Sequence, residues 1–342
     1  MSGEQGSTPP NKIRMAAHDP ETVSSNPLRN AAGSPRPPRG AFTRGAAVAV
    51  ALLGGACASA SPTEPQACEL GSARNGAECT PFALRSSLMV PTPWMEGGAA
   101  ITLEMIAYRP LDATGPMPTV VFHHGSTGNG DDPSLFGLTY ESLSLARFLT
   151  ERGWMVLFPQ RRGRGASGGV YDEGFTADRS RYSCEAAPAL AGLERALEDA
   201  NVVTDFVLVM NEVDPQRLLV GGTSRGGILA AAHAERRATA YRGVVNFVGG
   251  WLGEGCVDAT TVNRSTFEDA AGQPSPVLWL YGENDPFYSV AHSRTSFDAF
   301  LAAGGVGEFH VYRRSSATAN GHFIINEPAL WGADLEAFLG EH

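Results

Sequence analysis

Residues 218–227 read LLVGGTSRGG and place Ser224 between an apolar run and a series of small residues. Residues 218–220 are typical of a buried strand, and residues 228–234 continue in a pattern typical of a helix. A strand that turns directly into a helix holds the residue at the turn in a strained conformation and exposes its side chain. Glycines two positions before and two after it leave room for the neighbouring backbone. The stretch therefore predicts Ser224 as a nucleophile at a strand–turn–helix apex.

A serine hydroxyl is a weak nucleophile near neutral pH, so Ser224 needs a base and an acid that orients the base. An apolar, strand-like run at residues 277–281 ends shortly before Asp285, and a later short strand and polar loop lead to His322. We predict Asp285 as the acid and His322 as the base. Glu283 is the competing acid and lies closer to the end of its strand.

The oxyanion that forms during acyl transfer needs preorganised donors, which are usually backbone N–H groups. One donor is expected from Arg225, directly after the nucleophile. The other is expected from the glycine-rich loop that follows an apolar strand near residues 119–123, where Ser126 is the first choice and Thr127 the second. His124, at the base of that loop, is expected to be structural.

At this point the chain resembles the α/β-hydrolases, and more narrowly the dienelactone-hydrolase-related and prolyl-oligopeptidase-like serine esterases. The resemblance covers about residues 85–342. Five stretches carry it, in the order of the family: His124-Gly125-Ser126, Arg161-Arg162-Gly163-Arg164-Gly165-Ala166-Ser167, Gly222-Thr223-Ser224-Arg225-Gly226-Gly227, Tyr281-Gly282-Glu283-Asn284-Asp285 and Gly321-His322. The dienelactone hydrolases proper carry a cysteine nucleophile, whereas this chain has Ser224. That departure favours a general ester over the dienelactone itself as substrate.

Alternation of strands and helices predicts the same fold class, α/β, with a mainly parallel central sheet and helices on both faces. Strand-like runs lie near 101–108, 119–123, 154–158, 218–222, 243–248, 277–281 and 309–312, and the first of them is expected at an antiparallel edge. Helical patterns lie near 140–151, 188–210, 226–236, 291–303 and 328–339. Residues 249–275 have room for a loop or one short helix, and 166–189 form another short excursion, so we expect no large cap domain.

Aromatic residues near strand ends are candidates for binding substrate. Tyr171, Trp251 and Phe287 are expected to line the cleft, with packing in the core or at the surface as the alternative for each. Nearby, the arginines 161, 162 and 164 either bind an acidic group of the substrate or pair with carboxylates such as Asp172 or Glu173.

The first 60 residues differ in composition from the rest of the chain. Residues 1–40 are rich in Pro, Ser, Gly and Asn and bury too little apolar surface to fold. A basic stretch, a short apolar run and small residues at 58–60 then follow the pattern of a secretory signal peptide. We expect a leader with signal peptide at 1–60, an extracytoplasmic tether at 61–84 and a catalytic domain at 85–342. The protein is then secreted or periplasmic, or a lipoprotein anchored at Cys57, which ends a stretch similar to a lipobox.

Cleavage after Ala60 leaves four cysteines, an even number that fits an exported, disulfide-bonded protein. A Cys68–Cys79 bridge would close a short loop, and a Cys184–Cys256 bridge would join two excursions near the proposed cleft. Four cysteines allow three pairings, and free buried thiols are the alternative. No Cys/His spacing indicates a metal site, and we expect no metal and no cofactor.

The net charge and the near absence of lysine exclude several functions. Residues 61–342 carry 20 arginines, no lysine and 33 acidic residues, a formal charge of −13. This balance argues against nucleic acid or an anionic membrane as partner. The only lysine is Lys12, in the leader, so a Ser–Lys dyad, a Schiff base and a P-loop lysine are excluded.

The best interpretation is therefore a serine hydrolase that cleaves carboxylic esters through an acyl-enzyme with a Ser-His-Asp triad. Its partner is a small-molecule or polymeric ester, and we expect a monomer whose only membrane attachment would be a lipidated Cys57. The alternatives are a serine peptidase or peptide-amide hydrolase and a non-catalytic binding protein on the same fold. Fold resemblance alone does not identify the substrate.

Overall fold

The structure, a computed structural model, describes residues 68–69, 71–75, 78–314, 316 and 318–342. The chain divides into two units after Pro62, and all described residues belong to the second, Thr63–His342. The predicted leader, its signal peptide and the lipidation site at Cys57 lie outside the described residues.

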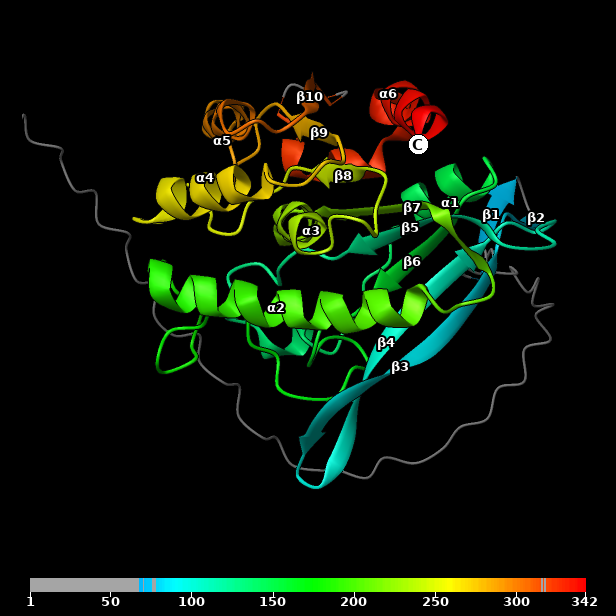
Figure 1. The fold of residues 1–342 in the computed structure, drawn as a ribbon, viewed down its shortest axis with the longest axis horizontal. Coiled ribbons are helices and arrows are strands. Elements are labelled where there is room, and N and C mark those ends of the chain that lie inside the picture. Colours follow the sequence, from blue (N-terminus) through cyan, green and yellow to red (C-terminus); the bar gives the residue numbers. More distant parts are fainter. Residues whose placement is uncertain (1–67, 70, 76–77, 315, 317) are drawn as a thin grey trace, which may run out of the picture. The chain divides into compact units, whose positions relative to one another are not determined.

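Eight strands form one sheet in the order β10-β9-β8-β7-β5-β6-β4-β3 (Figure 1). The pairs from β10 to β6 are parallel, whereas β4 pairs antiparallel with both β6 and β3. The predicted mainly parallel sheet with an antiparallel edge is therefore confirmed. The strands are β3 Leu84–Glu96, β4 Ala99–Arg109, β5 Met117–His123, β6 Met155–Pro159, β7 Val213–Thr223, β8 Val244–Phe247, β9 Val277–Gly282 and β10 Gly307–Tyr312.

The helices divide between the two faces of the sheet because the crossovers run in two directions. A right-handed crossover puts its helix on one face when the chain moves one way along the sheet, and on the other face when it moves back. The connection from β5 to β6 steps one way, and all later connections step the other way. One face therefore carries α1 Leu143–Thr150, and the other carries α2 Ala186–Val207, α3 Arg225–Arg236, α4 Ala259–Ala270 and α5 Val290–Ala302. The last helix, α6 Pro328–Glu341, packs against α1.

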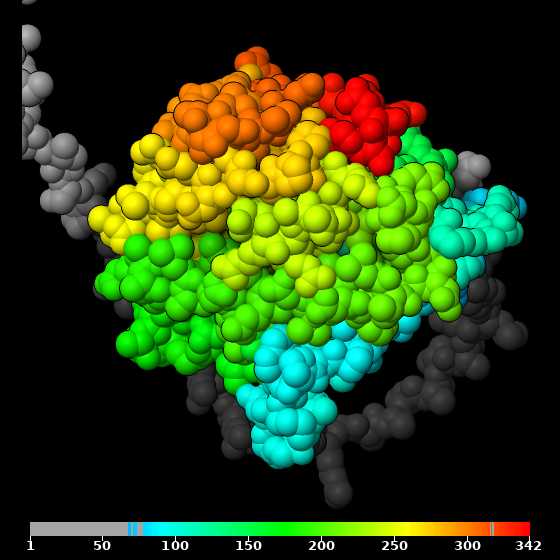
Figure 2. Space-filling view, in the orientation of Figure 1, coloured from blue at the N-terminus to red at the C-terminus, as the bar shows by residue number. Residues whose placement is uncertain are grey.

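The central strands form because most of their residues are apolar, and the few polar ones, Thr119, His123 and Asn246, are buried as well. Every residue of β5, β6, β8 and β9 is buried, as expected of strands that helices cover on both faces. Trp331 of α6 is completely buried and joins the layers, since its ring lies 5.0 Å from that of Phe148 on α1 and 5.1 Å from that of Phe247 on β8. In Figure 2 the side chains of α2 to α4, green to yellow, close over their face of the sheet.

The sequence did not predict the edge strand β3. Only Val90 is buried in this strand, and its register with β4 shifts between Pro91 and Met95. Proline has no N–H group to donate a hydrogen bond within a sheet, but it is tolerated at sheet edges and bulges. The prolines at 91 and 93 therefore weaken the sequence pattern of a strand without preventing the strand. The far end of the β3–β4 hairpin emerges beside α2 in Figure 2.

Part of the predicted tether is folded. Within residues 61–84, β1 Ser72–Asn75 and β2 Glu78–Pro81 pair into a separate two-stranded antiparallel sheet. A disulfide joins Cys68 to Cys79, as one of the open pairings predicted. No helix of the described residues is both long enough and apolar enough to cross a membrane.

The two predicted excursions stay small, and the residues that the structure describes form no large cap domain. Between β8 and β9 the chain forms a loop and the 12-residue helix α4. Residues 166–184 contain no helix or strand, only an isolated bridge between Phe175 and Tyr182. Both excursions contribute residues to the cavity described next.

Candidate active site

Ser224 lies at a sharp turn between β7 and α3. Its φ of 56° and ψ of −125° are strained for a residue with a side chain. The turn depends on its glycines, because a Cβ on Gly222 would lie 2.1 Å from the Gly226 carbonyl oxygen, and a Cβ on Gly226 would lie 2.1 Å from the His123 carbonyl oxygen. The structure thus places Ser224 at the strand–turn–helix apex that the sequence predicts.

His322 and Asp285 meet at the same edge of the sheet. His322 lies in the short 3-10 helix Gly321–Asn326 that precedes α6, and Asp285 lies in the loop after β9. The His322 Nδ1 is 2.8 Å from the Asp285 Oδ2, and the Asp285 side chain is completely buried. Because a carboxylate only accepts hydrogen bonds, Nδ1 carries the proton in this pair. The other ring nitrogen, Nε2, is therefore a hydrogen-bond acceptor.

Backbone donors fix the second oxygen of Asp285. Its Oδ1 accepts hydrogen bonds from the N–H groups of Phe287 at 2.8 Å and Tyr288 at 3.1 Å. The competing acid, Glu283, instead forms an exposed ion pair with Arg313 at 2.5 Å. The geometry therefore favours Asp285 over Glu283 as the acid that orients His322.

One cavity of about 730 Å³ contains most of the predicted site. Ser224, His322, Ser126 and Arg225 line it, together with the predicted substrate contacts Trp251 and Phe287. The cavity opens where the loops after β5 and β7 meet. At that point the chain reverses its direction along the sheet, which is where open α/β sheets bind ligands.

Tyr171 does not line this cavity. It is buried, packs against Phe136, Phe175 and Tyr182, and shares a 2.6 Å hydrogen bond with the hydroxyl of Tyr182, which does line the cavity. Tyr171 thus lies behind the wall, and the sequence-based prediction of direct substrate contact is not what the structure shows. Burial raises the pKa of Tyr171, so its hydroxyl stays neutral.

The loop after β5 lies directly against the serine, since a Cβ on Gly125 would be 3.0 Å from the Ser224 Cβ. The N–H of Thr127 is occupied by the Tyr182 hydroxyl at 3.1 Å. In contrast, the N–H groups of Ser126 and Arg225 bond to no residue that the structure describes. Of the two loop donors that the sequence suggested, Ser126 is therefore the one left for a substrate oxygen.

His124 holds this loop in place. Its Nε2 accepts the N–H of Arg161 at 3.2 Å, so its Nδ1 carries the proton and donates to the Gly125 carbonyl at 2.7 Å. Burial, and next the charge of Arg161, lower the pKa of His124 well below its ordinary value. The ring is therefore neutral and structural, as the sequence analysis expected.

Two of the three clustered arginines form buried ion pairs, which the sequence left as one of two alternatives. Arg161 pairs with Glu173 at 2.5 Å, and Arg162 pairs with Asp199 on α2 at 2.5 Å. Asp172, the other expected carboxylate, pairs with Arg179 instead. Arg164 alone of the three lines the cavity, and its Nε and Nη1 bond to no described residue.

Sequence reasoning missed Tyr288, which links Ser224 to Asp285. Its hydroxyl donates to the Gly250 carbonyl at 2.7 Å, and the Gly250 N–H donates to the Ser224 carbonyl at 3.2 Å. Burial raises the pKa of Tyr288, while Arg225 and a hydrogen bond with the Ser224 side chain oppose the rise. The only indication in the sequence is its position three residues after Asp285.

Replacing Tyr288 by phenylalanine is expected to lower the free energy of unfolding by about 1–3 kcal/mol, because the buried Gly250 carbonyl loses its donor. Thermal or denaturant unfolding measures this change. Tyr312→Phe is the control, since Tyr312 donates to Asp334, whose side chain is 36 % exposed and can bond to water instead. Equal losses in the two variants would contradict the assigned role of Tyr288.

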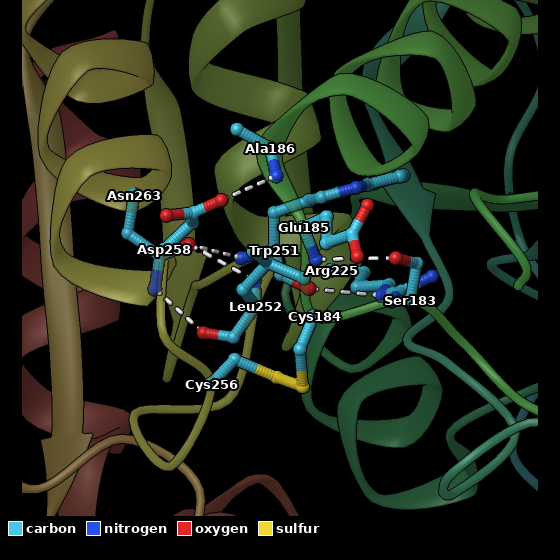
Figure 3. Close-up of a disulfide and its surroundings, with 10 residues drawn as sticks. All are labelled: Ser183, Cys184, Glu185, Ala186, Arg225, Trp251, Leu252, Cys256, Asp258 and Asn263. Carbon is cyan, nitrogen blue, oxygen red and sulfur yellow. Dashed lines mark hydrogen bonds between the residues drawn. A yellow bond between two sulfur atoms is a disulfide. The ribbon is translucent and has the colours of Figure 1, made fainter.

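A disulfide between Cys184 and Cys256 joins the two excursions, and both cysteines line the cavity (Figure 3). Hydrogen bonds around it hold the same loops. The Ala186 N–H donates to Asp258 at 2.7 Å, and the Arg225 Nε donates to the Trp251 carbonyl at 3.0 Å. The bridge therefore fixes one wall of the cavity.

Removing the Cys184–Cys256 bridge with a double serine substitution is expected to lower the free energy of unfolding by about 2–4 kcal/mol, because the bridge closes a long loop of the unfolded chain. The cysteines are 72 residues apart, compared with 11 for Cys68 and Cys79. The matched double substitution at Cys68 and Cys79 should therefore cost less and leave KM unchanged. An intact mass that shows four free thiols in the non-reduced, exported protein would rule out both bridges.

Solved structures share this fold. A proposed dienelactone hydrolase from Klebsiella pneumoniae is 20 % identical, with a TM-score of 0.50 over 76 % of this chain and 100 % of that chain. An esterase from Pyrococcus furiosus is 14 % identical, with a TM-score of 0.51 over 76 % and 90 %. A proposed dipeptidyl aminopeptidase IV from Bacteroides ovatus is 12 % identical, with a TM-score of 0.51 over 76 % and 36 %. At these identities the likeness concerns the fold alone.

Sequence comparison identifies the family. No curated protein matches the chain. The model of the dienelactone hydrolase family matches residues 106–318, which include Ser126, Ser224 and Asp285 and stop just before His322. With an α/β-hydrolase sheet and more than half of its length matched, the chain belongs to the dienelactone hydrolase family.

Proposed function

We propose that the protein is a serine esterase that hydrolyses carboxylic esters through an acyl-enzyme on Ser224. The observation that carries the proposal is the 2.8 Å pair of His322 Nδ1 and buried Asp285, together with the cavity that both His322 and the strained Ser224 line. Family membership supports a hydrolase, and the site geometry supports the finer assignment of nucleophile, base and acid.

The proposed reaction begins when the Ser224 Oγ attacks the ester carbonyl and the His322 Nε2 takes its proton. Asp285 keeps His322 in the correct tautomer and stabilises the imidazolium. The N–H groups of Ser126 and Arg225 donate to the oxygen that becomes negative. When the tetrahedral intermediate collapses, the imidazolium returns the proton to the departing alcohol, and the acyl group remains on Ser224.

A water molecule completes the cycle. His322 takes a proton from the water, whose oxygen attacks the acyl carbonyl, and the second tetrahedral intermediate uses the same two N–H donors. Its collapse releases the carboxylic acid and returns the proton to the Ser224 Oγ. None of these proposed reaction steps uses a metal or a cofactor.

The proposal also covers where the protein works. Two disulfides are consistent with an extracytoplasmic protein, because such bridges persist in oxidising compartments. We propose that the mature enzyme is secreted or periplasmic, or anchored through a lipidated Cys57, and that it is a monomer with no nucleic-acid partner. Its acidic formal charge supports the last point.

Labelling with a fluorophosphonate tests the proposal, because this probe reacts covalently with an activated serine. Peptide mapping should find the label on Ser224, and competition with ester substrates should slow the labelling. A panel of matched esters and amides then separates an esterase from a peptidase. Absence of both labelling and ester turnover would indicate a non-catalytic binding protein and overturn the proposal.

A further inference from the structure

Two exposed aromatic rings flank the proposed base. The ring of Phe287 lies 4.8 Å from that of His322, and the ring of Phe323 lies 5.8 Å from it, as measured between centroids. Phe287 is 38 % exposed and Phe323 is 48 % exposed, and both line the cavity. They are the only exposed phenylalanines among the described residues, and both lie at this site.

Both rings are held by the segments that carry the acid and the base. Phe287 donates its N–H to Asp285 at 2.8 Å, and Phe323 follows His322 in the same 3-10 helix, whose start is capped by the Asn320 side chain. Each ring therefore belongs to a segment that is hydrogen-bonded next to Asp285 or His322, and each remains exposed in the wall of the cavity. Fixed, solvent-facing aromatic rings bind flat apolar groups by stacking or edge contacts.

The position of the rings determines which part of an ester they contact. In the proposed mechanism the imidazolium of His322 must give its proton to the departing alcohol, so the alcohol oxygen lies beside His322 when the first bond breaks. The carbonyl oxygen lies on the other side of Ser224, at the N–H groups of Ser126 and Arg225. Groups that flank His322 therefore face the alcohol part of the substrate rather than the acyl part.

We propose that Phe287 and Phe323 form a subsite for the alcohol part of the substrate, and that the preferred substrates are esters of aromatic alcohols. This inference rests on the proposed function and adds the substrate class. The chemistry is that of the ester hydrolysis described above: the Ser224–acyl bond forms, the ester C–O bond breaks, and the aromatic alcohol leaves with the proton from His322.

Benzyl butyrate and methyl butyrate test the proposal. They share one acyl group, and their alcohols have similar acidity, so a difference in kcat/KM reports contacts with the alcohol part. The wild-type enzyme should prefer benzyl butyrate. Replacing Phe287 and Phe323 together by leucine should lower the ratio of kcat/KM for benzyl butyrate to kcat/KM for methyl butyrate by roughly tenfold or more, at about three- to tenfold for each ring.

Three further measurements separate a binding role from a structural one. The alcohol has already left the butyryl-enzyme that both esters form, so the loss in the double variant should fall on acylation more than on hydrolysis of this intermediate. Added benzyl alcohol should capture the acyl group in competition with water in the wild type, and much less in the variant. In the Phe287→Leu variant, which keeps only the ring at position 323, a further Phe323→Trp change should restore the preference for benzyl butyrate. The control is Val209→Ala, at an exposed apolar residue outside the cavity, which should not alter the preference.

The experiments distinguish failure of the alcohol subsite from failure of the proposed esterase function. An equal loss for both esters would show that the rings hold the acyl part or support the triad, and an unchanged ratio would show that they do not contact substrate. Either result overturns the subsite while ester hydrolysis stands. If the wild type hydrolyses neither ester and Ser224 is not labelled by a fluorophosphonate, the proposed function fails and the subsite fails with it.

Discussion

Replacing Ser224 by alanine is expected to lower kcat for ester hydrolysis by about 10⁴-fold or more, because the proposed acyl-enzyme forms on its hydroxyl. The fold should survive, since the Ser224 N–H and carbonyl, which bond to Phe247 and Gly250, are unchanged. Steady-state kinetics measures the loss, and the melting temperature checks the fold. The expected residual rate comes from the oxyanion donors and from substrate binding alone.

Ser134→Ala is the matched control for this loss. Ser134 is an exposed serine in the short 3-10 helix before α1, and it does not line the cavity. Its hydroxyl donates only to the exposed Asp132, so its replacement should leave kcat within about twofold, as is usual for changes at the surface. Near-normal activity in Ser224→Ala would remove Ser224 as the nucleophile and leave the strained turn without its proposed role.

The sequence predicts the parts of this molecule that depend on local chemistry. The nucleophile turn is a local pattern of strand, small residues and helix, so its position follows from ten residues. The central strands are also predictable, because both their faces are buried and most of their residues are apolar. The chain order of Ser224, Asp285 and His322 then follows from which strands end before them.

Features that depend on distant partners could not be predicted to the same degree. The role of Arg161 depends on Glu173, and that of Arg162 depends on Asp199, so the sequence left ion pairing and substrate binding as alternatives. Tyr288 was missed because its partner, Gly250, lies 38 residues earlier in the chain. Tyr171 was placed in the cavity because sequence cannot distinguish a residue that lines a wall from one directly behind it.

A buried cluster of three charges beside the site gives the largest expected effect on stability. Glu173 lies 2.5 Å from the Arg161 Nε and 3.5 Å from the Arg225 Nη1, and the three side chains are 3–4 % exposed. Burial alone would raise the pKa of Glu173, but the charges of Arg161 and Arg225 outweigh it and hold that pKa below its ordinary value. The carboxylate is therefore ionised and compensates two buried cations.

Glu173→Gln is expected to lower the free energy of unfolding by about 3–5 kcal/mol, because two guanidinium groups stay buried without an opposite charge. For a unit of this size the melting temperature should fall by roughly 10 °C. Activity should also decrease, since Arg161 donates to the Gly125 carbonyl in the oxyanion loop and Arg225 begins α3. Denaturant unfolding of the two proteins at pH 7 measures the difference.

Glu151→Gln provides the control, because Glu151 pairs with Arg147 at 2.7 Å on the surface and is 46 % exposed. Exposed pairs contribute about 0–1 kcal/mol, so this variant should unfold almost as the wild type does. A loss at Glu173 no larger than that at Glu151 would show that the cluster is not the buried, charged unit proposed.

Acid pH gives a second, independent test of the same cluster. A carboxyl group whose pKa is lowered by folding stabilises the fold above its unfolded value, about 4.3 for glutamate, and this contribution is lost as the pH falls through the lowered value. Glu173→Gln has no such group to protonate. The stability difference between wild type and variant should therefore be constant near neutral pH and narrow below about pH 4. A gap that stays constant into acid would mean that the loss comes from packing rather than from the charge of Glu173.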